Sequence, residues 1–170
     1  MTLDHRTGLY EACQRLSPIH SDHANLRIEE GFNWSSCLAG VHFDGLYLIV
    51  FRSVRRATAD LELLKEYDDK AYAEALQTGG LLRYFRGSVN ERRECLSFCL
   101  WESREQARRA SGGAAHRTAT GITAEMYESY FLERYYLIRE ETGDLVFRRL
   151  GGILSREDAP GGSSRELQEA

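Results

Sequence analysis

The sequence predicts an α+β fold in which a strand, a helix, two strands, a second helix and a further strand follow one another. Three observations predict this order. A continuous run of branched and aromatic residues over 46–53 is typical of a strand covered on both sides. An amphipathic stretch over 59–77 indicates a helix. Two apolar runs, 81–86 and 95–101, are separated by a polar link of hairpin length. Together with the segments after residue 101, they give the ferredoxin-like βαββαβ arrangement.

The third strand, residues 95–101, is predicted to be buried on both faces. Side chains alternate along a strand, so Leu96, Phe98 and Leu100 form a uniformly apolar face. The opposite face is mixed and carries Cys95, Ser97, Cys99 and Trp101. Both faces of this strand are therefore expected to be buried.

A second helix is predicted to begin after Ser103, because Gln106 follows it at capping-box spacing. Gly112 and Gly113 interrupt this helix, since a glycine costs about 1 kcal/mol relative to alanine inside a helix. His116 then falls on a second helical piece. An aromatic, alternating strand follows over 127–138, and a turn leads to a short additional strand near the end.

The remaining segments flank a predicted domain at residues 44–154. Residues 1–43 read as an irregular arm, with a short helix that Pro18 ends and a strand near residues 25–29. Residues 155–170 are rich in glycine, serine and charge, which predicts a disordered tail. His20, Asp22 and His23 cluster in the arm, but one short loop supplies too few donors for a closed metal site.

The composition of the chain excludes several classes of function. With 170 residues, 42% hydrophobic, 28% charged and a net charge of −4, the chain reads as one soluble domain with no concentrated basic surface for nucleic acid. It shows no signal peptide and no apolar run of membrane-spanning length. The four cysteines have no disulfide spacing, which predicts reduced thiols in a cytoplasmic protein.

The predicted sheet would carry both helices on one face. Its other face would then present apolar and aromatic side chains to solvent, which is unusual for a monomer. The sequence therefore predicts a homodimer that buries this face and encloses a chamber for a small molecule.

The segments VFRSVRRATADLE, GGLLRYFRG, LSFCLWESREQARRASGGAAHRTA and MYESYFLERYYL resemble the antibiotic-biosynthesis-monooxygenase group of dimeric α+β barrel proteins. The resemblance covers residues 46–138. It rests on Trp101, Ser103, His116, Tyr127 and Tyr130 occurring in this order. It implies an oxidoreductase, in which an aromatic or polyketide-like substrate itself reduces O₂ and no cofactor is needed.

In that cofactor-free scheme, the resemblance implies that Trp101, Tyr127 and Tyr130 hydrogen-bond the substrate and that His116 acts as a base. Further substrate-binding candidates are Arg83 and Arg52, which could stabilise negative charge, together with Asn33, Trp34 and Cys99. Each aromatic candidate can also be a packing residue.

Two alternatives follow from the same resemblance. His116 could be the axial ligand of a heme. The heme-degrading branch of the group has an asparagine on the first strand and a tryptophan on the helix. This sequence has no asparagine on the first strand and no tryptophan at positions 107–110. The other alternative is a small-molecule binding or cyclisation-assisting protein without catalysis. No flavin, nicotinamide or P-loop motif is present in the sequence.

Overall fold

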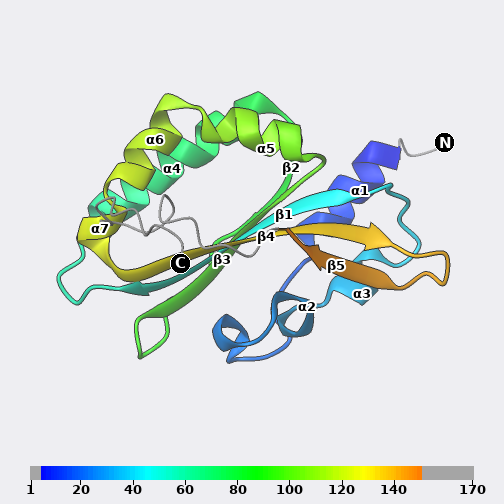
Figure 1. Ribbon diagram of the computed structural model, residues 1–170, viewed down its shortest axis with the longest axis horizontal. Coiled ribbons are helices and arrows are strands. Elements are labelled where there is room, and N and C mark those ends of the chain that lie inside the picture. Colours follow the sequence, from blue (N-terminus) through cyan, green and yellow to red (C-terminus); the bar gives the residue numbers. More distant parts are fainter. Residues whose placement is uncertain (1–4, 151–170) are drawn as a thin grey trace, which may run out of the picture.

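The computed structural model describes residues 5–150 and contains one five-stranded antiparallel sheet (Figure 1). Its strands are β1 (Leu46–Arg55), β2 (Leu81–Phe85), β3 (Glu94–Trp101), β4 (Tyr127–Arg139) and β5 (Leu145–Arg149). They lie in the order β2-β3-β1-β4-β5. The first four strands reproduce the ferredoxin-like order, so the predicted fold class is confirmed, with β5 as the additional edge strand. The predicted tail at 155–170 lies outside the described residues.

One face of the sheet carries α4 (Leu61–Thr78), α5 (Arg104–Ser111), α6 (Ala114–Gly121) and α7 (Thr123–Met126) (Figure 1). Asp60 caps α4 by accepting the Leu63 N–H at 3.0 Å. The predicted Ser103 cap is present, because its hydroxyl accepts the Gln106 N–H at 3.3 Å. The predicted interruption at the glycine pair is also confirmed, since α5 and α6 are separate helices. No helix within residues 5–150 is long and apolar enough to span a membrane.

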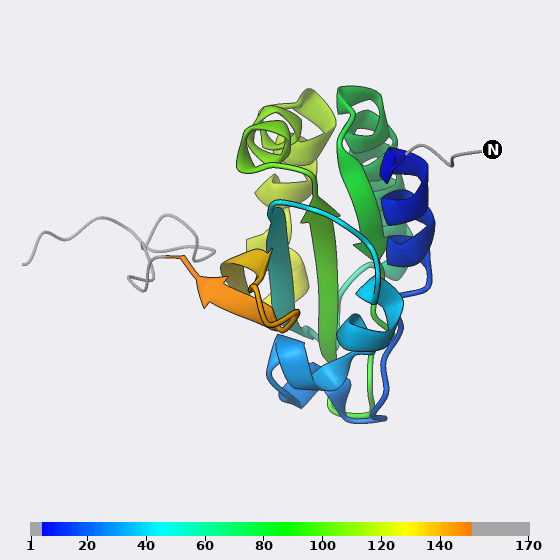
Figure 2. The ribbon, with the colours of Figure 1, turned by 90° about the vertical axis from the view of Figure 1, so that its right-hand side faces the viewer.

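The opposite face is covered by the first part of the chain (Figure 2). This arm contains α1 (His5–Gln14), the 3₁₀ turn η1 (His23–Asn25), α2 (Ile28–Gly31) and α3 (Trp34–Leu38). The prediction of a strand at residues 25–29 is wrong. The backbone there forms tight local bonds, from Leu26 N–H to His23 and from Gly31 N–H to Arg27, which an extended strand cannot make.

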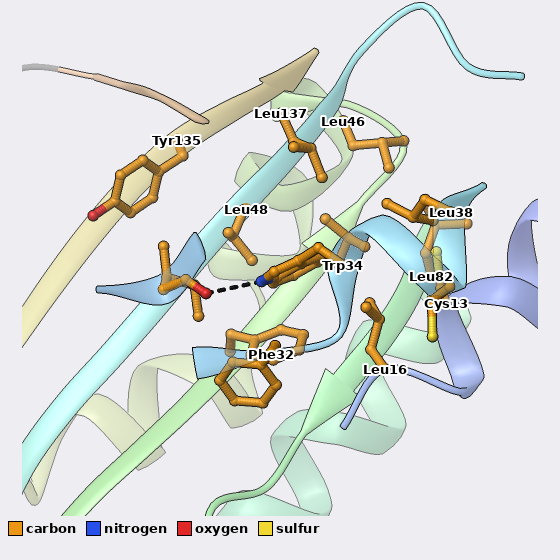
Figure 3. Close-up of a cluster of buried hydrophobic side chains, with 14 of the residues drawn as sticks. Cys13, Leu16, Phe32, Trp34, Leu38, Leu46, Leu48, Leu82, Tyr135 and Leu137 are labelled. Atoms are coloured by element: carbon orange, nitrogen blue, oxygen red, sulfur yellow. Dashed lines mark hydrogen bonds between the residues drawn. The ribbon is translucent and has the colours of Figure 1, made fainter. Parts of the chain in front are cut away.

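The arm and the sheet share one hydrophobic core. Trp34 lies at its centre, only 2% exposed, and its indole N–H donates to the Ile28 carbonyl at 2.8 Å (Figure 3). Around it pack Leu48 and Leu137 from the sheet and Leu16 from the arm. The sheet face expected to be bare is therefore covered by the chain's own residues. A homodimer stays a prediction, and its interface would have to use another surface.

The alternation expected along β3 is observed. Leu96, Phe98 and Leu100 are fully buried beneath the arm. Cys99 and Trp101 face the helical layer, where Trp101 packs with Ala107 and Ala110 of α5. The two faces of this strand therefore belong to different cores.

A β-bulge in β4 decides which side chains face the helices. Ser53 of β1 pairs with Tyr130, but Arg55 pairs with Tyr127, so one residue of β4 is extra. In a regular strand residues three apart point to opposite faces. The bulge instead brings both tyrosine rings to the same side, with centroids 5.2 Å apart.

Candidate functional site

A cavity of about 420 Å³ lies between the sheet and helices α4–α7. Its size is in the range of small-molecule sites. Helix α4 has no buried residue, because the cavity separates it from the sheet. This cavity lies within a single chain, on the helix-covered face of the sheet, and not on the face where the sequence predicted a chamber between two subunits. Its lining includes Phe51, Arg55, Lys65, Tyr67, Asp68, Tyr72, Tyr84, Arg86, Cys95, Ser97, Cys99, Trp101, His116, Tyr127 and Tyr130.

The structure brings five of the predicted site residues together around this cavity. Cys99 and Trp101 come from β3, His116 from α6, and Tyr127 and Tyr130 from β4. These five residues span 31 positions of the sequence, from Cys99 to Tyr130. The roles of these five residues stay predictions.

Arg52 and Arg83 do not line this cavity, because both belong to the face covered by the arm. Arg52 forms a half-buried ion pair with Glu133 at 2.8 Å and donates to the carbonyls of Ala24 and Leu26. Arg83 donates to the Gln14 side chain at 3.2 Å. Both arginines hold the arm on the sheet, so the expectation that they stabilise a substrate's charge in this cavity is corrected.

Asn33 and Trp34 are likewise placed in the arm, away from the cavity. The Asn33 side chain accepts the Ser17 N–H at 2.8 Å and donates to the Arg15 carbonyl at 3.2 Å. The Trp34 indole is buried in the core between the arm and the sheet. Their polar atoms are used within the arm, so neither residue is available as a wall of the cavity.

His116 is held by an acidic cap on its helix. The Glu74 carboxylate of α4 accepts the N–H groups of Ala114, Ala115 and His116 at 2.9–3.2 Å. An anion at a helix N-terminus is stabilised by these free donors. Burial lowers the pKa of His116 below its usual 6.5, and the nearby Glu74 charge partly opposes this change. The half-buried imidazole is therefore neutral at pH 7 and able to accept a proton.

Tyr127 and Tyr130 of β4 are in their protonated form at neutral pH. Burial raises the pKa of Tyr130, and the neighbouring Tyr127 adds to the effect. Burial also raises the pKa of Tyr127, which the Arg55 guanidinium beside it partly offsets. Their hydroxyl groups can act as hydrogen-bond donors toward an oxygen of a bound molecule.

An ionic cluster that sequence reasoning missed forms one wall of the cavity. The Tyr84 hydroxyl donates to Asp68 at 2.5 Å, and Arg86 pairs with Asp68 and with Asp69 at 2.7 Å each. Burial and the Asp68 charge raise the pKa of Tyr84. Lys65 also pairs with Asp69, at 2.6 Å. A charge pattern on α4 was visible in the sequence, but the partners on β2 were not.

Two further features concern Trp101 and the thiols. Trp101 is only 3% exposed, and its indole N–H has no hydrogen-bond partner among the described residues.

Burial raises the pKa of both Cys95 and Cys99, so these thiols stay protonated and are poor nucleophiles. All four cysteines are free.

The residues present do not fit a heme-degrading site. Strand β1 carries no asparagine, and α5 has alanine at positions 107 and 110 in place of a tryptophan. Within residues 5–150, no group of three or more histidine, cysteine or acidic side chains could hold a metal ion. Ligation of a heme by His116 alone stays an alternative for experiment.

Comparison with known protein families gives a match over residues 1–148, to the family described as PB2B2.08-like. The chain belongs to this family. The match includes the N-terminal arm as well as the sheet. The UPF0643 protein PB2B2.08 of Schizosaccharomyces pombe is 30% identical over 111 residues, which cover 61% of this chain and 50% of that protein. The chain thus matches about half the length of this relative.

Solved structures similar to this member of the PB2B2.08-like family include antibiotic-biosynthesis-monooxygenase-like proteins. A putative antibiotic biosynthesis monooxygenase from Nitrosomonas europaea has a TM-score of 0.47 and 16% identity, covering 55% of this chain and 92% of that one. SnoaB, a cofactor-independent oxygenase from Streptomyces nogalater, has a TM-score of 0.43 and 10% identity, covering 58% of this chain and 95% of that one.

Proposed function

We propose that this protein binds an aromatic or polyketide-type small molecule in the cavity between the sheet and α4–α7 and oxidises it with O₂ without a cofactor. The observation that carries the proposal is the cavity of about 420 Å³ in which Trp101, His116, Tyr127 and Tyr130 converge. Aromatic walls favour a flat, apolar ligand, because they bury its surface and can stack on its rings.

The proposed chemistry needs little from the protein beyond positioning and one proton transfer. An anthrone-type substrate has an acidic methylene group between two rings. His116, neutral at pH 7, would remove one proton from it. The resulting carbanion reduces O₂, and loss of water from the peroxide leaves a quinone carbonyl, so that CH₂ and O₂ become C=O and H₂O.

The hydroxyl groups of Tyr127 and Tyr130 and the indole N–H of Trp101 would stabilise the oxyanion that develops during this reaction. Each is a donor in its neutral form at pH 7. The indole N–H of Trp101, which has no hydrogen-bond partner within residues 5–150, favours this assignment, because a buried donor without a partner costs about 1–3 kcal/mol until a ligand accepts it.

Oxygen uptake with an anthrone as substrate tests the proposal. We expect the wild-type protein to consume O₂ and form the quinone, and His116→Ala to lower the rate on the order of 100-fold, because a general base contributes about that much. His42→Ala is the matched control, since the His42 side chain is 80% exposed and does not line the cavity. Its rate should equal that of the wild type.

Two outcomes would replace the proposal by an alternative. Tight binding of the aromatic molecule without oxygen uptake would indicate a binding or cyclisation-assisting protein. A Soret band in the purified protein that His116→Ala abolishes would indicate heme ligation by this histidine. If His116→Ala and the wild type oxidised the substrate at equal rates, the proposed oxidation would be supported, but His116 would not be its general base.

A further inference from the structure

We infer that the molecule bound in this cavity is an organic acid whose carboxylate pairs with Arg55. This inference rests on the proposed function in one respect, that the cavity is a ligand site. Arg55 is the last residue of β1, and it lines the cavity close to Tyr127 and Cys95, whose pKa values its charge affects.

Arg55 differs from the other cations of the cavity wall. Lys65 pairs with Asp69, and Arg86 pairs with both Asp68 and Asp69. Within the described residues, Arg55 has no carboxylate at ion-pair distance, and its Nε is buried without a hydrogen-bond partner. A guanidinium held beside buried aromatic and thiol groups without a counter-ion is destabilising. A ligand carboxylate would supply the missing partner.

The bulge explains why no residue within 5–150 neutralises Arg55. Glu128 lies at the bulge, across from Arg55 on β4. Its carboxylate is bound by Arg93 at 2.6 Å, and the same Arg93 nitrogen donates to the Arg55 carbonyl at 2.7 Å. Arg93 adopts a left-handed backbone conformation, with φ of 63°, that few non-glycine residues take. The acid beside Arg55 is thus engaged elsewhere, and the guanidinium stays available.

The geometry of a guanidinium also indicates the kind of acid. Its N–H groups form a planar fork that matches the two oxygens of a carboxylate. The β3 and β4 walls beside it carry the rings of Trp101, Tyr127 and Tyr130, so the remainder of the ligand is expected to be apolar and flat. An aromatic carboxylate satisfies both requirements, and the low local polarity strengthens the charge pairing.

Binding of two matched probes tests this inference. One probe is dihydroxyanthraquinone, and the other is the same ring system with one added carboxylate. We expect the wild type to bind the carboxylate probe at least 10-fold more tightly, measured by calorimetry at pH 7. Arg55→Gln should remove this preference and leave the affinity for the neutral probe within about twofold, because it deletes only the charge pairing.

Three controls accompany the measurement. Arg56→Gln removes a neighbouring, exposed arginine that does not line the cavity and should leave both affinities unchanged. Arg55→Lys keeps the charge without the fork and should retain part of the preference. Without ligand, Arg55→Gln should melt at the same temperature as the wild type or higher, because Arg55 has no carboxylate partner to lose within the described residues and glutamine can keep a hydrogen bond to Tyr127.

Equal affinity of the wild type for the two probes would overturn the inference and leave the cavity as an aromatic site. Loss of both affinities in Arg55→Gln, with Arg56→Gln unaffected, would also overturn it, because a structural role of Arg55 would then explain the result. If neither probe bound the wild type, the inference would fall together with the proposed binding of aromatic molecules.

Discussion

At the scale of single residues, two arginines on the same strand have different roles because their surroundings differ. Arg52 and Arg55 are three positions apart on the same strand. Arg52 faces the arm, where Glu133 and two backbone carbonyls satisfy it. Arg55 faces the cavity and has no acidic partner in the described chain. The alternation of a strand thus gives one arginine a structural role and leaves the other available for a ligand.

His116 provides a prediction at this scale. Its pKa in the folded protein lies below 6.5, so the unfolded chain binds a proton more readily. The contribution of His116 to stability is therefore fully present above about pH 6.5 and is lost as the pH falls through the folded-state pKa. Urea unfolding of the wild type and His116→Asn should show the wild type losing more stability on acidification. Parallel curves for the two proteins would contradict this.

At the scale of elements, α6 depends on its neighbour for its N-terminal cap. Gly113 supplies no side-chain cap, and Glu74 of α4 takes this role across the helix pair. A Cβ on Gly113 would collide with the Glu74 carboxylate in its present position, so a larger residue there would have to displace this carboxylate from the start of α6. The glycine pair that ends α5 therefore also admits the carboxylate that positions His116.

Glu74→Gln should lower the free energy of unfolding by about 1 kcal/mol, because the charge at the start of α6 is lost. The pKa of His116 should fall further, since the Glu74 charge raises it in the wild type. Histidine titration by NMR and urea unfolding measure the two effects. Glu66→Gln is the control, because Glu66 is exposed on the same helix and forms an ion pair with Lys70, away from α6. An unchanged His116 pKa in Glu74→Gln would refute this coupling.

At the scale of the whole molecule, the arm is part of the fold. It covers one face of the sheet while the helices enclose the cavity on the other, so the chain provides both layers itself (Figures 1 and 2). The large aromatic core beneath the arm explains why the sheet does not need a second copy to cover this face. Phe32, Trp34 and Phe98 form part of this core, with ring centroids 5.2–6.1 Å apart.

Trp34→Ala should destabilise the protein by about 3–5 kcal/mol, the usual cost of removing a large buried aromatic side chain. Ile19→Ala is the matched control in the same arm, because Ile19 is 56% exposed, and it should change stability by less than about 0.5 kcal/mol. Urea unfolding measures both. Light scattering on Trp34→Ala should reveal association through the loosened sheet face. A Trp34→Ala protein as stable as the wild type would mean that the arm is dispensable.

Most of the secondary structure of residues 46–150 follows from local pattern. The apolar runs, the helical stripe of α4, the Ser103 cap and the break at Gly112 and Gly113 act over a few residues, so their effect can be read from the sequence. The arm was harder to predict, because its short helices are held by distant groups such as Arg52 and not by a periodic pattern.

The sequence by itself determined the order of strands and helices, the two unlike faces of β3, and the presence of His116 on a helical piece after the glycines. Only the tertiary structure decided which face the arm covers, that the cavity lies within one chain, and that Tyr127 and Tyr130 share a side. The physical reason is the distance along the sequence over which each interaction acts. Propensity and periodicity are local, whereas a bulge, a cap from another helix and an unpaired arginine depend on contacts between distant segments.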